Sequence, residues 1–285
     1  MYDNFILRKT DGGNIAGYIW PVEDPDKVVC LVHGIGEYAG RYERVAEAFH
    51  ERNIAMISMD LRGHGLSAGK RGHCAPRASV LEDITKLIEY AESLYPGKPL
   101  VLYGHSMGGN ITLDYRSRGE LNDKAVGYII SAPWIRLVRS VPGALLSAVK
   151  IIAKIKPDLT MGSGVDETKL GNTQSVGAYV KNQLVHDKIS LATAIDGFEI
   201  GEAIEKGTLP DNGRAKDIPL LLMHGDQDAI CDVNGSRALA SRLEDNGDNY
   251  SYVEWPGLYH EIHNGGPESL GDEVIATMAD WISEL

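Results

Sequence analysis

The sequence predicts an α/β fold, with a mostly parallel central sheet flanked by helices and with an inserted helical cap. Short apolar runs rich in β-branched residues alternate with longer helical stretches, as parallel strands buried on both faces alternate with the helices that cover them. A stretch of roughly 85 residues interrupts this alternation, far more than an ordinary connection needs. The total length of 285 residues accommodates one large domain with such an insertion.

The chain begins with a predicted antiparallel edge, where two apolar-leaning runs flank Asp11-Gly12-Gly13-Asn14. This turn chemistry favours positive φ and closes hairpins. Further strands are predicted over residues 28–32, 54–59, 100–103, 126–130, 220–223 and 250–255. Helices are predicted over residues 41–52, 80–94, 107–118, 235–244 and 268–282.

The long insertion opens with LVRSVPGALLSAVKIIAKIKPD, in which lysines separate apolar pairs at near-helical spacing. An insertion after a central strand lies over the carboxyl ends of a parallel sheet, where ligands bind in open α/β folds. We therefore expect a core formed by residues 1–133 and 216–285, and a cap formed by residues 134–215.

Composition and charge exclude several classes of function. A formal net charge of −12 cannot easily supply the basic face that nucleic acid requires, so we expect no nucleic-acid partner. The first residues lack the basic and apolar regions of a secretory signal, which makes the cytoplasm the expected location. Cys30, Cys74 and Cys231 have the spacing of neither a disulfide framework nor a zinc site, and we expect them to be reduced. No apolar run is long enough to span a membrane.

The segment Gly104-His105-Ser106-Met107-Gly108 follows a predicted buried strand and precedes an apolar helix. A G-x-S-x-G pattern in this context is a nucleophile elbow, in which small residues two positions before and after the serine let strand and helix approach. It predicts Ser106 as a nucleophile. The alternative is a glycine-rich turn whose serine caps a helix.

A serine nucleophile needs a base to take its proton and a carboxylate to orient that base. In this fold the chain order is serine, acid, histidine, so both partners must follow Ser106. After the strand over residues 220–223 come Asp226 and Asp228, of which we prefer Asp228. After the last strand come His260 and His263, of which we prefer His260 because it follows Gly257 and the strand end closely.

Of the remaining histidines, four precede or flank the serine and violate this chain order, and His186 lies in the predicted cap. His50 and His224 are interpreted as structural. The others are at most residues that line the substrate site: His33, His64, His73, His105 and His186.

An oxyanion needs two preorganised N–H donors. The elbow supplies the N–H of Met107, and the glycine-rich run that follows the strand over residues 28–32 supplies the second, which we assign to Ile35. Gly34 in this run is expected to line the substrate site. The alternative is a glycine-rich turn without a catalytic role.

Taken together, these segments resemble the monoglyceride lipase and lysophospholipase branch of the α/β-hydrolases, also grouped as serine aminopeptidase-like hydrolases. The resemblance is carried by HGIGEYAGRY, DLRGHGLSAGKRG, GHSMGGN, HGDQDAICD and GLYHEIHN. It implies Ser106, Asp228 and His260 as the triad, Ile35 and Met107 as oxyanion donors, and Cys231 close to the site. It also implies hydrolysis of monoacylglycerols or related esters without a metal or cofactor.

The leading hypothesis is therefore acyl-ester hydrolysis through an acyl-enzyme on Ser106. Lysophospholipids are an alternative substrate, and peptidase or amidase action by the same triad is another, for which acids of the cap such as Asp166, Glu167 and Asp196 could bind a substrate ammonium. A non-catalytic ligand-binding protein is disfavoured because all three triad residues are present. The apolar residues of segment 137–155 either contact a lipid surface or pack on the core and line a closed acyl tunnel.

Overall fold

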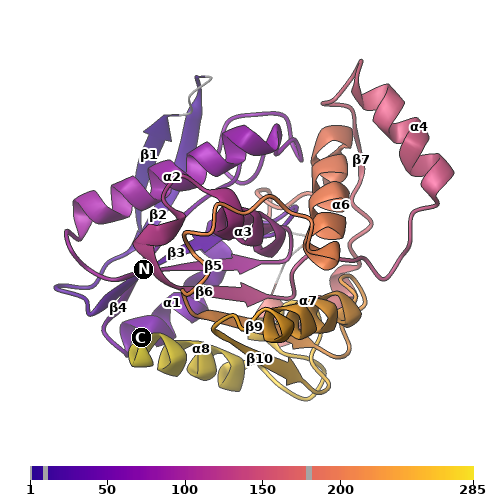
Figure 1. Ribbon diagram of the computed structural model, residues 1–285. Helices are drawn as coiled ribbons and strands as arrows, with labels where there is room; N and C mark the ends of the chain where they lie inside the picture. Colours follow the sequence, from indigo (N-terminus) through magenta and orange to yellow (C-terminus); the bar gives the residue numbers. More distant parts are fainter. Residues whose placement is uncertain (1, 9–11, 178–181) are drawn as a thin grey trace.

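The computed structural model describes residues 2–8, 12–177 and 182–285. Its main sheet has eight strands in the order β1-β2-β4-β3-β5-β6-β9-β10 (Figure 1). β2 pairs antiparallel with β1 and β4, and the neighbours from β4 to β10 are all parallel. The predicted mostly parallel sheet is thus confirmed. The strands are β1 (Asp3–Arg8), β2 (Asn14–Trp20), β3 (Lys27–Val32), β4 (Ile54–Met59), β5 (Leu100–His105), β6 (Ala125–Ser131), β9 (Leu220–Gly225) and β10 (Tyr250–Trp255).

The predicted hairpin joins β1 and β2, whose register ends at the pair of Arg8 with Asn14. In the predicted turn, Gly12 and Gly13 have φ of 87° and 88°. These values lie in the left-handed region, which glycine enters at little cost. Asp11 lies outside the described residues.

The continuous apolar runs of the central strands are explained by burial on both faces of the sheet. In β3, Val28 and Cys30 pack in one hydrophobic cluster, while Val29 and Leu31 pack in another. Successive side chains of a strand point to opposite faces, so each face buries its own apolar layer.

Helices cover both of these layers (Figure 1). α1 (Glu43–His50) and α8 (Asp272–Glu284) pack on one face, and α2 (Arg77–Leu94), α3 (Met107–Arg118) and α7 (Val233–Asp245) pack on the other. α3 has the predicted bounds. The helix expected from residue 41 begins as a 3-10 turn (Ala39–Tyr42) before α1, and the helix expected from residue 268 begins only after Gly271, whose φ is 85°.

The insertion between β6 and β9 contains α4 (Gly143–Ala153), the short α5 (Thr173–Val176) and α6 (Leu191–Lys206). It also contains β7 (Thr160–Gly162) and β8 (Lys188–Ser190), an antiparallel pair that the sequence analysis did not anticipate. α6 packs on α3, and α4 lies outermost beside α6 (Figure 1). Among the described residues, no helix combines the length and apolarity needed to cross a membrane.

Candidate active site

Ser106 occupies a sharp turn between β5 and α3. Its φ of 57° and ψ of −118° are strained for a residue with a side chain. The flanking glycines make the turn possible: a Cβ on Gly104 would lie 2.4 Å from Thr112 Oγ1, and one on Gly108 would lie 2.0 Å from the carbonyl oxygen of Val32. The G-x-S-x-G spacing therefore reflects the close approach of strand and helix.

The chain brings three polar side chains together at the carboxyl ends of the parallel strands. Ser106 Oγ lies 2.8 Å from His260 Nε2, and His260 Nδ1 lies 2.6 Å from Asp228 Oδ2. Asp228 lies in the loop after β9, and His260 in the loop after β10. With the Nδ1 proton donated to the carboxylate, Nε2 is left to accept the serine proton.

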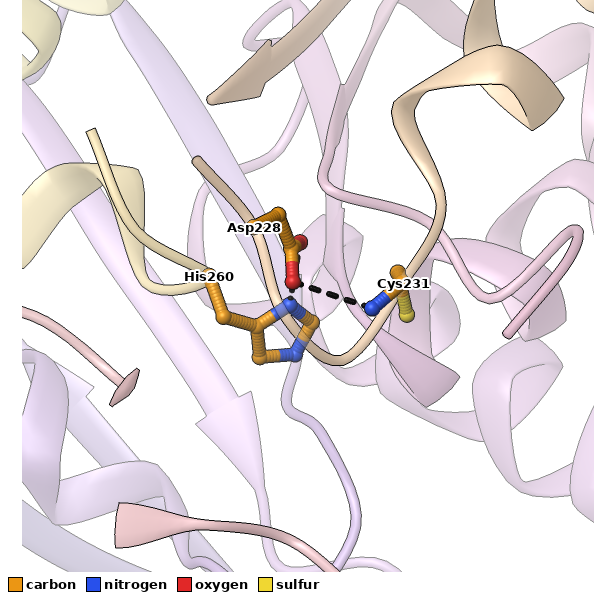
Figure 2. Close-up of side chains that lie close together, drawn as sticks. All are labelled: Asp228, Cys231 and His260. Atoms are coloured by element: carbon orange, nitrogen blue, oxygen red, sulfur yellow. Dashed lines mark hydrogen bonds and ion pairs between the residues drawn. The ribbon is translucent and has the colours of Figure 1, made fainter. Parts of the chain in front are cut away.

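Asp228 is held by both of its oxygens. Its Oδ1 accepts the backbone N–H of Cys231 and its Oδ2 contacts His260 (Figure 2). Oδ1 also accepts the backbone N–H of Ile230, and Oδ2 also contacts His224 at 3.1 Å. Burial opposes ionisation of this carboxyl, but His260 and His224 outweigh burial and lower the pKa of Asp228. The acid is therefore charged at neutral pH.

The same contact acts on His260, the predicted base. Burial alone would lower the pKa of His260, yet the Asp228 carboxylate outweighs burial and raises it. A base with a raised pKa holds an abstracted proton more strongly, because the neighbouring carboxylate stabilises the imidazolium.

The two alternative residues lie in other environments. His263 stacks on Tyr42 with ring centroids 4.9 Å apart, and burial lowers the pKa of His263 to about 3. Asp226 Oδ1 accepts the backbone N–H of Gly257 at 2.7 Å and so ties together the loops after β9 and β10. The structure thus places His260 and Asp228, the preferred residues, next to Ser106.

The two expected oxyanion donors lie in segments that border the serine or its cavities. Met107 is the first residue of α3, where backbone N–H groups have no acceptor within the helix. Ile35 lines, together with Ser106, the two cavities at the site. Next to it, the N–H of Gly34 donates to Glu37 Oε1 at 2.6 Å, which fixes the loop that carries Ile35.

A cavity of about 310 Å³ opens onto Ser106. Apolar side chains form most of its wall, among them Trp134, Leu137, Met161 and Phe198. Three charged side chains also line it, namely Arg139, Asp166 and Lys169. An apolar cavity with a few polar groups is the usual form of a small-molecule site.

The predicted lining residues divide into three groups. Cys231 lines this large cavity, whereas Gly34 and His105 line a much smaller one beside Ser106 and His260. His33 is instead buried beneath the loop, where it accepts the N–H of Leu61 at Nε2 and contacts the carbonyl of Gly34 through Nδ1. His33 thus supports the loop that carries Gly34 and Ile35.

Sequence reasoning missed two groups of residues that contact the predicted triad or lie beside it. His224, interpreted as structural, is buried between Asp228 and Ser236 and fixes the acid. Glu37, Arg41 and Glu261 form a buried ion-pair cluster beside the base. Their positions next to the motifs HGIGE and YHE were the only signal that could have indicated them.

Ligand atoms of Asp228, Cys231 and His260 lie within 4.8 Å of one another, close enough to surround a metal ion (Figure 2). Asp228 and His260, however, bind each other at 2.6 Å. Burial also raises the pKa of the Cys231 thiol, which disfavours the thiolate that metals prefer. The donor set therefore suits proton transfer better than metal binding.

Comparisons with known proteins agree with this geometry. Residues 23–266 match the family described as "Serine aminopeptidase, S33". The chain is 32% identical over 275 residues to the monoacylglycerol lipase of Mycolicibacterium smegmatis, covering 95% of this chain and 93% of that protein. The crystal structure of a monoacylglycerol lipase from Paleococcus ferrophilus superposes with a TM-score of 0.81 at 29% identity, covering 95% of this chain and 98% of the other.

An uncharacterised abhydrolase domain-containing protein of Dictyostelium discoideum is 33% identical over 280 residues, which are 98% of this chain. The chain spans only 28% of the length of that relative.

Proposed function

This chain belongs to the serine aminopeptidase S33 family, and from its site and its similarity to monoacylglycerol lipases we propose that it hydrolyses monoacylglycerols through an acyl-enzyme on Ser106. The observation that carries the proposal is the chain of two hydrogen bonds from Ser106 through His260 to Asp228, at the base of an apolar cavity. The protein is a carboxylic ester hydrolase, in agreement with its relatives.

In the first half of the reaction, Ser106 Oγ attacks the ester carbonyl while His260 Nε2 takes the hydroxyl proton. The imidazolium is stabilised by Asp228, and the N–H groups of Ile35 and Met107 stabilise the negative oxygen of the tetrahedral intermediate. When the ester C–O bond breaks, His260 returns the proton to the leaving alcohol.

In the second half, a water molecule replaces the alcohol. His260 takes a proton from this water, its oxygen attacks the acyl carbon, and the bond to Ser106 breaks as the serine regains a proton. The acyl group leaves as a carboxylate. The same base serves both halves because its proton is returned in each.

The walls of the cavity favour a lipid acyl chain over a peptide. An aminopeptidase needs an acid free to bind the substrate ammonium, but Asp166 accepts hydrogen bonds from Thr168 and shares the cavity with Lys169 and Arg139. Asp196 is partly buried and interacts with Arg77. Asp166 is thus already compensated, and neither Glu167 nor Asp196 is among the described residues that line the cavity, which argues against the peptidase alternative.

A second candidate substrate is a lysophospholipid, and one observation favours it. Arg139 and Lys169 place two cations and Asp166 one anion at the cavity, an excess of positive charge in a protein with net charge −12. A substrate phosphate would be attracted there.

We also propose that the protein contacts lipid surfaces through α4. None of the residues of α4 is buried; Ile151 in this helix is 65% exposed, and Ile155, just after it, is 79% exposed. Lys150 and Lys154 lie beside them. An apolar surface flanked by lysines suits the boundary between lipid and water, where the lysine stems extend toward the head groups.

A substrate panel tests the proposed reaction. We expect turnover of monoacylglycerols and p-nitrophenyl esters, weaker or comparable turnover of lysophospholipids, and none of aminoacyl anilides. Preferential cleavage of the anilides would contradict the proposal, and preferential cleavage of lysophospholipids would favour the second candidate.

A further inference from the structure

Arg41 lies between two buried carboxylates from distant parts of the chain. Its Nη1 is 2.5 Å from Glu37 Oε2 and 2.7 Å from Glu261 Oε1, and its Nη2 is 2.8 Å from Glu261 Oε2. The contact with Glu261 is bidentate, a geometry that fixes orientation as well as distance. The side chain of Arg41 is 9% exposed and those of both glutamates are 3% exposed, so water hardly competes.

Glu37 connects this arginine to the loop of the oxyanion donor. Its Oε1 accepts the N–H of Gly34 at 2.6 Å and the hydroxyl of Tyr42 at 3.0 Å. Gly34 directly precedes Ile35, and a Cβ on Gly34 would lie only 3.1 Å from Ser106 Cβ. A displacement of Glu37 therefore moves the donor loop relative to the nucleophile.

Glu261 connects the same arginine to the loop of the base. It directly follows His260, and its backbone N–H donates to the carbonyl of Leu170 at 2.6 Å. Its Oε2 also accepts a hydrogen bond from the side-chain amide of Asn264 at 2.7 Å. The residue next to the imidazole is thus fixed on its backbone and on its side chain.

We propose that Arg41 is a positioning residue that sets the spacing between the oxyanion donors and the base, with Glu37 and Glu261 as its two attachment points. This role rests on the proposed serine hydrolase mechanism. Arg41 acts through the glutamates, because each of them is tied to a loop that carries a reacting group. Such a role requires both ends of the guanidinium, which a lysine at this position cannot supply.

The cluster also sets the charge around the base. Burial raises the pKa of Glu37 against the attraction of Arg41, whereas Arg41 outweighs burial and lowers the pKa of Glu261. The negative charge of Glu261 adds to the larger effect of Asp228 in raising the pKa of His260. The other charged or titratable groups around this imidazole are His105, Cys231, His263, Glu37 and Arg41.

Two variants separate positioning from folding. Arg41→Lys keeps the charge but loses the bidentate contact, and we expect kcat for p-nitrophenyl acetate to fall by roughly 10- to 100-fold, as a misplacement of about 1 Å can cause. KM should remain unchanged. Glu261→Gln keeps an oxygen for Arg41 but removes the charge, which lowers the pKa of His260. Because the neutral imidazole is the active base, the acidic limb of kcat/KM should then move to lower pH.

Two other arginines that form bidentate pairs with carboxylates serve as matched controls for the loss of such a contact. Arg62 forms a bidentate pair with Asp83 that is as deeply buried as the Arg41 cluster. Arg237 forms an exposed bidentate pair with Glu254. Arg62→Lys should lower the melting temperature at least as much as Arg41→Lys but leave kcat unchanged, and Arg237→Lys should change neither.

The rate of labelling by a fluorophosphonate gives a second readout. In Arg41→Lys and Glu261→Gln, labelling of Ser106 should be slower but complete. Unchanged kcat and labelling rate in these two variants would overturn the proposal, as would an equal loss of kcat in Arg62→Lys. If Arg41→Lys does not fold, Glu261→Gln alone decides, and an unmoved acidic limb with unchanged kcat overturns the proposal.

These readouts distinguish the positioning role from the proposed substrate. Wild-type protein that cleaves p-nitrophenyl acetate but no monoacylglycerol would contradict the substrate and leave the role of Arg41 to be decided by the variants. Wild-type protein that neither cleaves this ester nor reacts with the fluorophosphonate would overturn both.

Discussion

The carboxyl end of the sheet and the outermost helix, α4, differ in which kind of side chain they bury and which they expose. Around Ser106 the polar groups are buried, and both Asp228 oxygens and both ring nitrogens of His260 have partners. On α4 no residue is buried, and the large apolar side chains of Leu145, Ile151 and Ile152 are exposed. One region places polar groups where water is scarce, and the other places apolar groups where water is plentiful.

Each arrangement is unfavourable for the free energy of folding. Burial of polar and charged groups is unfavourable unless every group is paired, and exposure of a large apolar patch is unusual for a protein that meets only water. The first cost is offset by a preorganised site. The second is offset if α4 meets an apolar phase. The functions that we propose for the two regions therefore differ, with chemistry in one and access to substrate in the other.

The largest expected effect is at the nucleophile. Ser106→Ala should lower ester turnover by about 10⁵-fold or more, since members of one triad act as a unit. Alanine retains the Cβ that already tolerates this turn, so the circular dichroism spectrum and melting temperature should match those of the wild type. A fluorophosphonate should label the wild type and not the variant, and labelling that persists would place the nucleophile elsewhere.

The next effect is at the acid. Asp228→Asn should lower kcat by about 10⁴-fold, because an asparagine no longer holds the imidazole in the tautomer that accepts the serine proton. Steady-state kinetics on p-nitrophenyl acetate measure the loss. Asp226→Asn is the matched control: it lies two residues away and binds a backbone N–H rather than the base, so its loss should be far smaller. A larger loss of kcat in Asp226→Asn than in Asp228→Asn would instead assign Asp226 as the acid.

Much of the buried region could be predicted from the sequence because its constraints are local. Backbone strain at Ser106 requires small neighbours at Gly104 and Gly108, and the chain order limits the acid to the loop after β9 and the base to the loop after β10. Two-faced burial gives the central strands their continuous apolar runs. These patterns are visible in one sequence because each arises within a few residues.

The rest could not be predicted because it depends on contacts between distant segments. Arg41 and Glu261 are 220 positions apart, and no local pattern relates them. His33 and His105 looked alike in sequence, yet one is buried beneath the loop and the other borders a cavity. In the insertion, the antiparallel pair of β7 and β8 involves strands of only three residues, too short for a periodic signal.

The same substitution should lower the free energy of unfolding much more in the sheet than in α4. Ile129 in β6 is fully buried, whereas Ile151 in α4 is 65% exposed. Ile129→Ala should lower the free energy of unfolding by about 2–5 kcal/mol through lost burial and a residual cavity. Ile151→Ala should change it by less than about 0.5 kcal/mol. Urea unfolding of both variants measures the difference, and a large loss in Ile151→Ala would mean that α4 is packed in solution.

The smallest expected effect concerns access to substrate. Ile151→Glu introduces a charge into the apolar surface of α4, and loss of one buried isoleucine side chain from a lipid contact is worth about 1.5 kcal/mol or more, or roughly tenfold in binding. Turnover of monoacylglycerol in vesicles should therefore fall by about that factor, while turnover of soluble p-nitrophenyl acetate is unchanged. Ile6→Glu is the matched control, since Ile6 on β1 is also 65% exposed but lies outside the insertion; it should change neither rate. Equal losses on both substrates, or a wild type that does not sediment with vesicles, would contradict the proposed lipid contact of α4.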